Sequence, residues 1–312
     1  MRRFLLARLA QAGLVALVVG TLCFALMRVL PGDATMRIAA GRYGPDAMTG
    51  QAAEKVRLEL GLDRPWPAQF LDWLENLVRF DLGHSLVTGA PVIEELKVQL
   101  GASLWLAAAA LLISLAIGPV AGVLAGLRPN GWADRLGLAT SVSLRAVPPF
   151  VLGLVLILVF AIWLGWLPPA GFGTTRDLVL PALTLALGLA AVSSRVTRDA
   201  VATVAKAPYF AFARHKGLPE AVVVRRHGLR NAAIPVVSYL GLQAIYLVEG
   251  VVVVESLFAY PGIGHALVHA IVERDIPMVQ GTALAMGLIF VAVTACVDAA
   301  SAWLDPRLRS AR

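Results

Sequence analysis

The sequence predicts an all-α, polytopic membrane protein with six transmembrane helices. Of its 312 residues, 58% are hydrophobic and only 15% are charged, a balance too apolar for an ordinary soluble domain. Apolar runs that can cross a bilayer, which takes about 20 residues, recur along the chain. Each is expected to be helical, because backbone groups in lipid must be hydrogen-bonded within the segment. The runs lie near residues 8–30, 101–127, 136–164, 178–197, 232–256 and 280–304.

Positive charge gathers at alternate ends of these runs, which predicts that both termini are cytoplasmic. The basic regions are residues 2–8, 128–135, 195–230 and 307–312. The net charge of +7 does not indicate nucleic-acid binding, because no soluble basic domain is present to carry it. The first run is too long for a signal peptide and lacks a small-residue cleavage pattern, so it is interpreted as an anchor.

The segment 31–99, after the first run, is the one long outer loop. Its seven Lys/Arg and ten Asp/Glu give a net charge of 7 − 10 = −3. The spacing of Val56 and Leu60 predicts a helix over 52–60 that ends at Gly61. The aromatic spacing of Trp66, Phe70 and Trp73 predicts an amphipathic helix at the membrane interface. The loop either caps its own membrane domain or contacts an external partner, and the two roles are compatible.

Two sites are expected to interrupt the helices. Pro148-Pro149 lies inside the third run, where proline frees carbonyl groups that can line a cavity. Gly262 and Gly264 predict a turn just outside the fifth run. The two cysteines, Cys23 and Cys296, fall inside apolar runs and are interpreted as packing residues without a disulfide or metal role.

Catalytic motifs are absent from the sequence. None of the four lysines follows a glycine, so the chain has no P-loop for ATP, and it has no H-E-x-x-H, CxxC or G-x-S-x-G. We therefore predict neither an enzyme nor a cofactor-binding chain.

Ionisable groups within the runs are the next candidates for function, because a charge in hydrocarbon is costly. Arg145 in the third run and Glu249 in the fifth are candidate residues of a translocation pathway. An internal ion pair or a contact with a partner subunit would explain them equally. Glu255 and Asp298 are expected close to a membrane face.

His265, His269 and Glu273 follow one another at four-residue spacing. On a helix they would share one face, a spacing that can bind a divalent metal. A solvated outer helix face gives the same pattern, and we expect no metal site.

The segment 195–230 carries eight Lys/Arg against two acids and joins the fourth and fifth runs. Pro208 predicts a helix start and Gly217 a helix end. A short helix with exposed aromatics fits a groove on a soluble partner. Insertion of Tyr209, Phe210 and Phe212 into lipid headgroups is the alternative.

This segment resembles the EAA loop of binding-protein-dependent ABC importer permeases, in the form found in the peptide/nickel subfamily. Ala211-Phe212-Ala213 take the E-A-A positions and His215 replaces a small residue. The residues that agree with the subfamily are Tyr209, Ala213, Arg214, Lys216, Gly217, Leu218, Arg226, His227, Leu229, Arg230, Asn231, Ala232, Ile234, Pro235 and Val236.

The resemblance runs nearly end to end. Its further motifs are Leu30-Pro31-Gly32-Asp33, Asp81-Leu82-Gly83-His84-Ser85, Leu180-Pro181-Ala182, VVVVESLFAYPGIG and Leu304-Asp305-Pro306-Arg307. Together they are similar to the B-type permease subunit of dipeptide/oligopeptide/nickel importers.

The resemblance implies the type I ABC importer permease fold in the bacterial inner membrane. It implies an N-terminal helix (1–30), an extracytoplasmic subdomain (31–99) and a permease domain (100–312) whose coupling loop spans about 198–231. The implied partners are a paralogous permease in a heterodimer, two ABC ATPase subunits that bind ATP and Mg, and an extracytoplasmic substrate-binding protein. Residues 209–218 and Arg226, His227, Leu229 and Arg230 would dock the ATPases.

The resemblance implies import of di- or oligopeptides, with nickel or a metal chelate as the alternative cargo. An ion-coupled secondary transporter is the rival class, although it would want paired repeats and coupling-ion residues near the midplane. A membrane protein that only recruits a partner is a further alternative.

Overall fold

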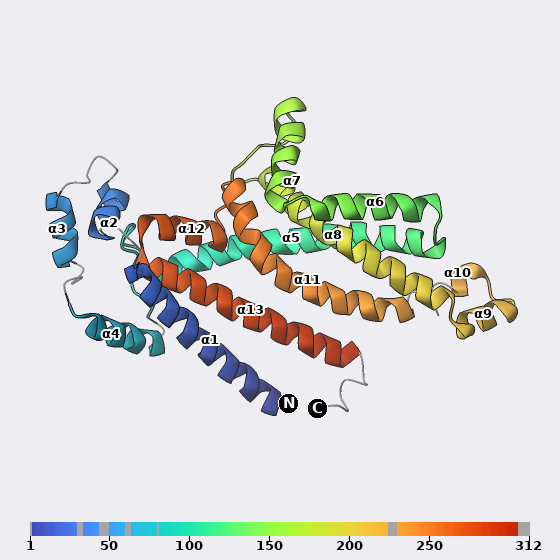
Figure 1. Ribbon diagram of the computed structural model, residues 1–312, viewed down its shortest axis with the longest axis horizontal. Coiled ribbons are helices and arrows are strands. Elements are labelled where there is room, and N and C mark those ends of the chain that lie inside the picture. Colours follow the sequence, from blue (N-terminus) through green and yellow to red (C-terminus); the bar gives the residue numbers. More distant parts are fainter. Residues whose placement is uncertain are drawn as a thin grey trace. The chain divides into compact units, whose positions relative to one another are not determined.

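The computed structural model describes residues 2–29, 34–43, 50–59, 64–79, 81–223 and 230–304. It is helical apart from one isolated bridge between His84 and Pro91, as predicted. Figure 1 shows the helices. In chain order they are α1 (Arg2–Val29), α2 (Ala34–Tyr43), α3 (Gly50–Glu59), α4 (Trp66–Val78), α5 (Val92–Leu127), α6 (Trp132–Ala146), α7 (Pro149–Leu156), the π-helix η2 (Ile157–Trp163), α8 (Thr175–Ala205), α9 (Pro208–His215), α10 (Glu220–Val223), α11 (Arg230–Leu257), α12 (Ile263–Glu273) and α13 (Ile276–Leu304).

Among the described residues, four helices are long and apolar enough to cross a membrane. They contain Leu6–Leu26, Val92–Leu127, Thr175–Ala205 and Ile276–Ala299. A fifth span is present if α6 and the α7–η2 segment are counted together, although they are bent by 105°. The bend lies at Val147–Pro148, which confirms the interruption that the proline pair predicts.

The helices extend further than the apolar runs. The second run begins near residue 101, whereas α5 already begins at Val92. Glu94 and Glu95 lie in the first turn of α5, where acids suit the positive end of the helix dipole. Helix formation therefore continues through polar residues that a hydropathy pattern leaves outside the span.

The chain forms two compact units. Unit 1 comprises residues 1–103 and 261–291, and unit 2 comprises 104–260 and 292–312. The core of unit 1 packs the first turns of α5 against α12 and the start of α13, through Val92, Leu96, Ile263 and Met278. Also in unit 1, α4 turns Phe70 and Trp73 towards Phe24 of α1, with the Phe24 and Phe70 rings 5.1 Å apart.

Unit 1 contains a buried polar clasp formed by Ser85 and Asp275. The Ser85 hydroxyl donates to the Asp275 carboxylate, and both side chains are buried. Asp275 also accepts the Met278 amide at 3.3 Å, which caps the start of α13. The Ser85 oxygen accepts the Thr88 amide at 2.9 Å, so the outer-loop turn and the α12–α13 turn share one network.

In unit 2, α8 packs against α6, α7 and α11. Glycines of α5 allow close approach to α8, since an added Cβ would lie 2.5 Å from the Thr197 Cβ at Gly122 and 2.7 Å from the Arg198 carbonyl oxygen at Gly126. The turn predicted at Gly262 is confirmed, because α11 ends at Leu257 and Gly262 precedes α12, whereas Gly264 lies inside α12 and not in the turn.

Candidate functional site

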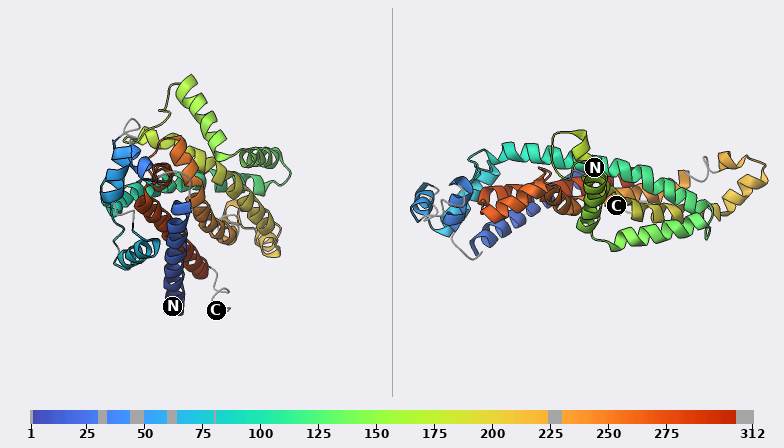
Figure 2. Two further views of the ribbon diagram at one scale, coloured as in Figure 1. Left: turned by 60° about the vertical axis from the view of Figure 1, so that its left-hand side comes forward. Right: turned by 90° about the horizontal axis from the view of Figure 1, so that it is seen from above.

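The α9–α10 hairpin follows the C-terminal end of α8 (Figures 1 and 2). Pro208 is the first residue of α9, where its missing N–H costs no helical hydrogen bond. Gly217 has a φ of 75°, which places it in the left-handed region that glycine adopts without steric cost. The sequence signals therefore predicted both ends of this helix correctly.

One side of α9 exposes an aromatic surface. Tyr209 and Phe212 are 44% and 61% exposed, and the Lys216 ammonium lies 4.8 Å from the centre of the Phe212 ring. Ala211, His215, Lys216, Gly217 and Leu218 are also exposed. The His215 ring lies 2.8 Å from the Ala211 carbonyl oxygen, within its own helix. An exposed aromatic and cationic face of this kind suits a protein groove that contains acidic groups.

Ala213 differs from its neighbours because it is buried. It is only 5% exposed and packs with Val223 of α10 against Val204 and Ala205 of α8. Its small size lets α9 approach the end of α8 closely. Its role in this structure is to join the hairpin to α8, rather than to present a surface.

Several predicted residues of this segment can be placed only in part. Arg226, His227 and Leu229 lie outside the described residues, as do the side chains of Phe210, Arg214 and Arg230. The backbone of Arg230 begins α11.

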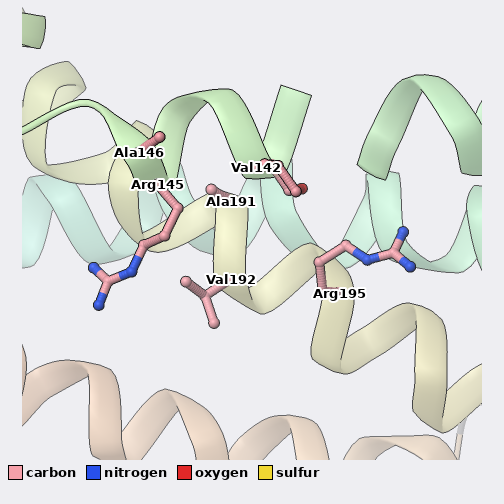
Figure 3. Close-up of a pocket in the computed structure, with 7 residues that line it drawn as sticks. Val142, Arg145, Ala146, Ala191, Val192 and Arg195 are labelled. Atoms are coloured by element: carbon pink, nitrogen blue, oxygen red, sulfur yellow. The ribbon is translucent and has the colours of Figure 1, made fainter. Parts of the chain in front are cut away.

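Arg145 lies in the last turn of α6, immediately before the bend. It lines an open pocket of about 490 Å³ between α6 and α8. Figure 3 shows Arg145 and Arg195 at opposite ends of this pocket, with Ala191 and Val192 between them. Among the described residues Arg145 forms no ion pair. Glu249, the other predicted pathway residue, lies on α11, and its side chain is outside the described part.

A cluster centred on Asp134 was not predicted from the sequence. The Asp134 carboxylate of α6 accepts hydrogen bonds from Arg198 Nη2 at 2.6 Å and Nε at 3.0 Å, and from Arg195 Nη1 at 3.0 Å. The signal available was one acid near the cytoplasmic start of the third run and two arginines one turn apart at the same end of the fourth. Their pairing depends on how two helices meet, which sequence spacing does not report.

The His265–His269–Glu273 pattern falls on α12, as the spacing requires. The two imidazole rings lie 4.4 Å apart, edge to face. Burial, and then the neighbouring His269, lower the pKa of His265. In the part of the chain that the structure describes, no three His, Cys, Asp or Glu side chains converge to hold a metal ion.

Two regions of the chain match known families of membrane transport components. Residues 118–310 match the family of the binding-protein-dependent transport system inner membrane component, and residues 1–95 match the N-terminal region of such membrane components. The chain therefore belongs to this family.

Individual relatives cover almost the whole chain. The glutathione transport system permease protein GsiC of Pectobacterium atrosepticum is 40% identical over 293 residues, or 94% of each chain. GsiC of Escherichia coli K12 is 40% identical over 292 residues, again 94% of each. A crystal structure of an amino acid ABC transporter with histidines aligns with a TM-score of 0.53 at 16% identity, over 67% of this chain and 94% of that one. This last likeness concerns the fold alone.

Family membership settles the general role. The chain is a multi-pass inner-membrane permease subunit of the peptide/nickel type, a non-catalytic component without a cofactor of its own. A binding-protein-dependent ABC transporter implies an ATPase that binds ATP, a binding protein and a partner permease. The rival class of ion-coupled secondary transporter is thereby excluded.

Proposed function

We propose that this permease imports short peptides, as one half of a heterodimeric pathway. The observation that carries the cargo is the 40% identity, over 94% of both chains, to permeases named for glutathione, a tripeptide-like solute. Nickel or a metal chelate is the alternative cargo.

The proposed topology has six transmembrane helices with both termini in the cytoplasm. The six are α1, α5, the bent α6–α7–η2 segment, α8, α11 and α13. The 28 residues of α11 exceed the roughly 20 that a bilayer requires. The proposed divisions are an N-terminal helix (1–30), an extracytoplasmic subdomain (31–99) and a permease domain (100–312).

The α9–α10 hairpin is proposed to receive the ATPase subunits, one bound to this chain and one to the paralogous permease. Exposed Tyr209 and Phe212 would enter a groove on the ATPase, and Lys216 would meet acids at its rim. Ala213 transmits the contact, because it packs α9 against the end of α8. ATP-driven closure would then move α8 and change access to the pathway.

Arg145 and Glu249 are proposed to face that pathway. Arg145 supports this role because it is an unpaired charge, among the described residues, at the end of the α6–α8 pocket. A guanidinium suits the carboxylates of a peptide, which it can bind through two parallel hydrogen bonds.

The coupling proposal is tested by Phe212→Asp in the complete transporter. Loss of a central aromatic contact costs on the order of 2 kcal/mol, roughly 30-fold in affinity. We expect the ATPase subunits to be lost on purification, while the permease remains in the membrane. Tyr43→Asp, at an exposed aromatic residue of α2, is the control and should retain them. Full ATPase recovery with Phe212→Asp would contradict the docking role.

A further inference from the structure

The Asp134 cluster (Asp134, Arg195 and Arg198) joins three segments of unit 2 through one carboxylate. Asp134 lies in the first turn of α6, and both arginines belong to α8. Its Oδ2 also accepts the amide of Asn130 at 2.9 Å. Asn130 belongs to the turn between α5 and α6 and has a φ of 65°. The turn, α6 and α8 are thus held at a single point.

The burial of Asp134 makes its separation from the two arginines costly in free energy. Its side chain is only 7% exposed, so its charge has exchanged water for protein donors. Arg198 binds it through two nitrogens and also bonds Asp199 at 3.0 Å. Two arginines and two aspartates balance to zero charge. Separating α6 from α8 here would leave a buried carboxylate without its donors, which is strongly unfavourable.

A second contact holds the same two helices further along. The hydroxyl oxygens of Ser141 on α6 and Ser194 on α8 lie 3.0 Å apart, and both residues are buried. The two contacts are seven residues apart on α6, about two helical turns. The two helices are therefore joined by two polar contacts that lie at different heights along α6.

The cluster also lies close to the α9–α10 hairpin along the chain. From Arg198, α8 continues for seven residues to Ala205. Val204 and Ala205, at that end, receive the buried face of the hairpin through Ala213 and Val223. These contacts form a continuous path from α9 through α8 to Asp134, and from there to α6 and the α5–α6 turn.

We propose that the Asp134 cluster is a positioning device that makes α6 and α8 move as one rigid body with the α9–α10 hairpin. The proposal rests on the proposed coupling function and deepens it. Asp134 touches neither ATPase nor cargo in this scheme. It carries the movement of α8 to the α6 segment that bears Arg145.

The first test locks α6 to α8 by a disulfide in the complete transporter. Ser141→Cys and Ser194→Cys would be introduced together with Cys23→Ala and Cys296→Ala, reconstituted in proteoliposomes, and oxidised with copper phenanthroline. Bond formation is followed by loss of maleimide labelling. We expect transport per ATP hydrolysed to be equal before oxidation, after oxidation and after reduction. If oxidation stops transport reversibly, α6 and α8 must move apart and the proposal is wrong.

The second test removes the charge at the cluster. Asp134→Asn should lower transport per ATP hydrolysed by about 2- to 30-fold, the range for a single coupling contact. Oxidation of the same variant carrying the cysteine pair should restore the ratio, because the covalent link replaces the ionic one. A role in folding alone would not respond to oxidation and reduction. An unchanged ratio in Asp134→Asn would overturn the proposal.

If Asp134→Asn prevents assembly of the transporter, a second variant still tests the proposal. In that case Asp134→Arg combined with Arg198→Asp, which reverses the pair, should restore both assembly and transport. Recovery of assembly without transport would refute the positioning role.

These results are distinguishable from failure of the proposed function. If the unaltered permease neither retains ATPases nor supports cargo-stimulated hydrolysis, the coupling function itself fails. If the unaltered permease retains the ATPases and supports cargo-stimulated hydrolysis, but the oxidised cysteine-pair variant no longer transports, only the rigid-body inference fails.

Discussion

The position of Arg145 in its helix determines what its guanidinium can contact. It lies in the last turn of α6, where a cation suits the negative end of the helix dipole. Its guanidinium lies at one end of the α6–α8 pocket, whereas Arg195 at the other end is held by Asp134 (Figure 3). Of the two arginines, only Arg195 forms an ion pair among the described residues.

We expect Arg145→Gln to reduce peptide transport without loss of the ATPase subunits. Replacing a charged hydrogen bond to a carboxylate costs about 1.5–3 kcal/mol, roughly 10- to 150-fold. The effect should fall on peptides with a free C-terminal carboxylate and spare their C-terminal amides. Uptake of the two forms into proteoliposomes measures this. Equal loss for both forms would show that Arg145 does not recognise the carboxylate.

Residue identity alone predicted the two ends of α9, but it did not predict which side chains of α9 are exposed. Pro208 and Gly217 act through their own backbone preferences, so the limits of α9 could be read locally. A family sequence pattern does not specify how the hairpin is oriented. That orientation decides whether Ala213 faces a partner or α8. The exposure of Phe212 and the burial of Ala213, one residue later, illustrate this limit.

At the scale of the helices, close contact between α5 and α8 depends on glycine. An added Cβ at Gly118 would lie 3.1 Å from the Ala190 carbonyl oxygen, and Gly122 and Gly126 repeat the close approach at four-residue spacing. In lipid, where apolar burial gives no net drive, such packing is a principal source of helix association.

Gly122→Leu is therefore expected to destabilise the permease. Overpacking typically costs 1–3 kcal/mol, and here the contacts include backbone atoms that cannot yield. Thermal unfolding in detergent should show a lower midpoint and the membrane should contain less protein. Gly137→Leu on α6, where an added Cβ meets nothing within 4 Å, is the matched control and should unfold as the parent does.

The elements themselves were largely predictable, because long apolar runs and proline act over short sequence distances. The Pro148-Pro149 break and the turn at Gly262 followed from local chemistry. The start of α5 at Val92 did not, since its first two turns are polar and are held by packing of Val92 and Leu96 against α12 and α13. Local composition does not reveal contacts between segments that lie about 170 residues apart in the sequence.

At the scale of the whole molecule, the chain is one subunit of a larger transporter. As a non-catalytic permease subunit of a binding-protein-dependent ABC transporter, the chain supplies the membrane component, while its ATPase partner binds ATP. The Asp134 cluster and the α9–α10 hairpin both belong to unit 2. The proposed connection is thus contained in one compact unit.

Cargo is tested on the assembled transporter with its binding protein. Peptide import predicts that glutathione or another short peptide stimulates ATP hydrolysis and enters proteoliposomes. Nickel ions with and without a chelator provide the comparison. Stimulation by nickel alone would reassign the cargo, and transport by the isolated permease would contradict the need for an ATPase.

The Ser85–Asp275 clasp has a consequence for how the outer region can vary. The clasp fixes the chain at Ser85 to the start of α13, and it does so downstream of α2, α3 and α4. We expect this hydrogen bond to hold Ser85 in place when the segment before residue 81 is changed. Exchanging residues 34–79 for the equivalent stretch of a homologue should therefore yield a chimaera that still inserts, because the Ser85–Asp275 hydrogen bond lies outside the exchanged segment.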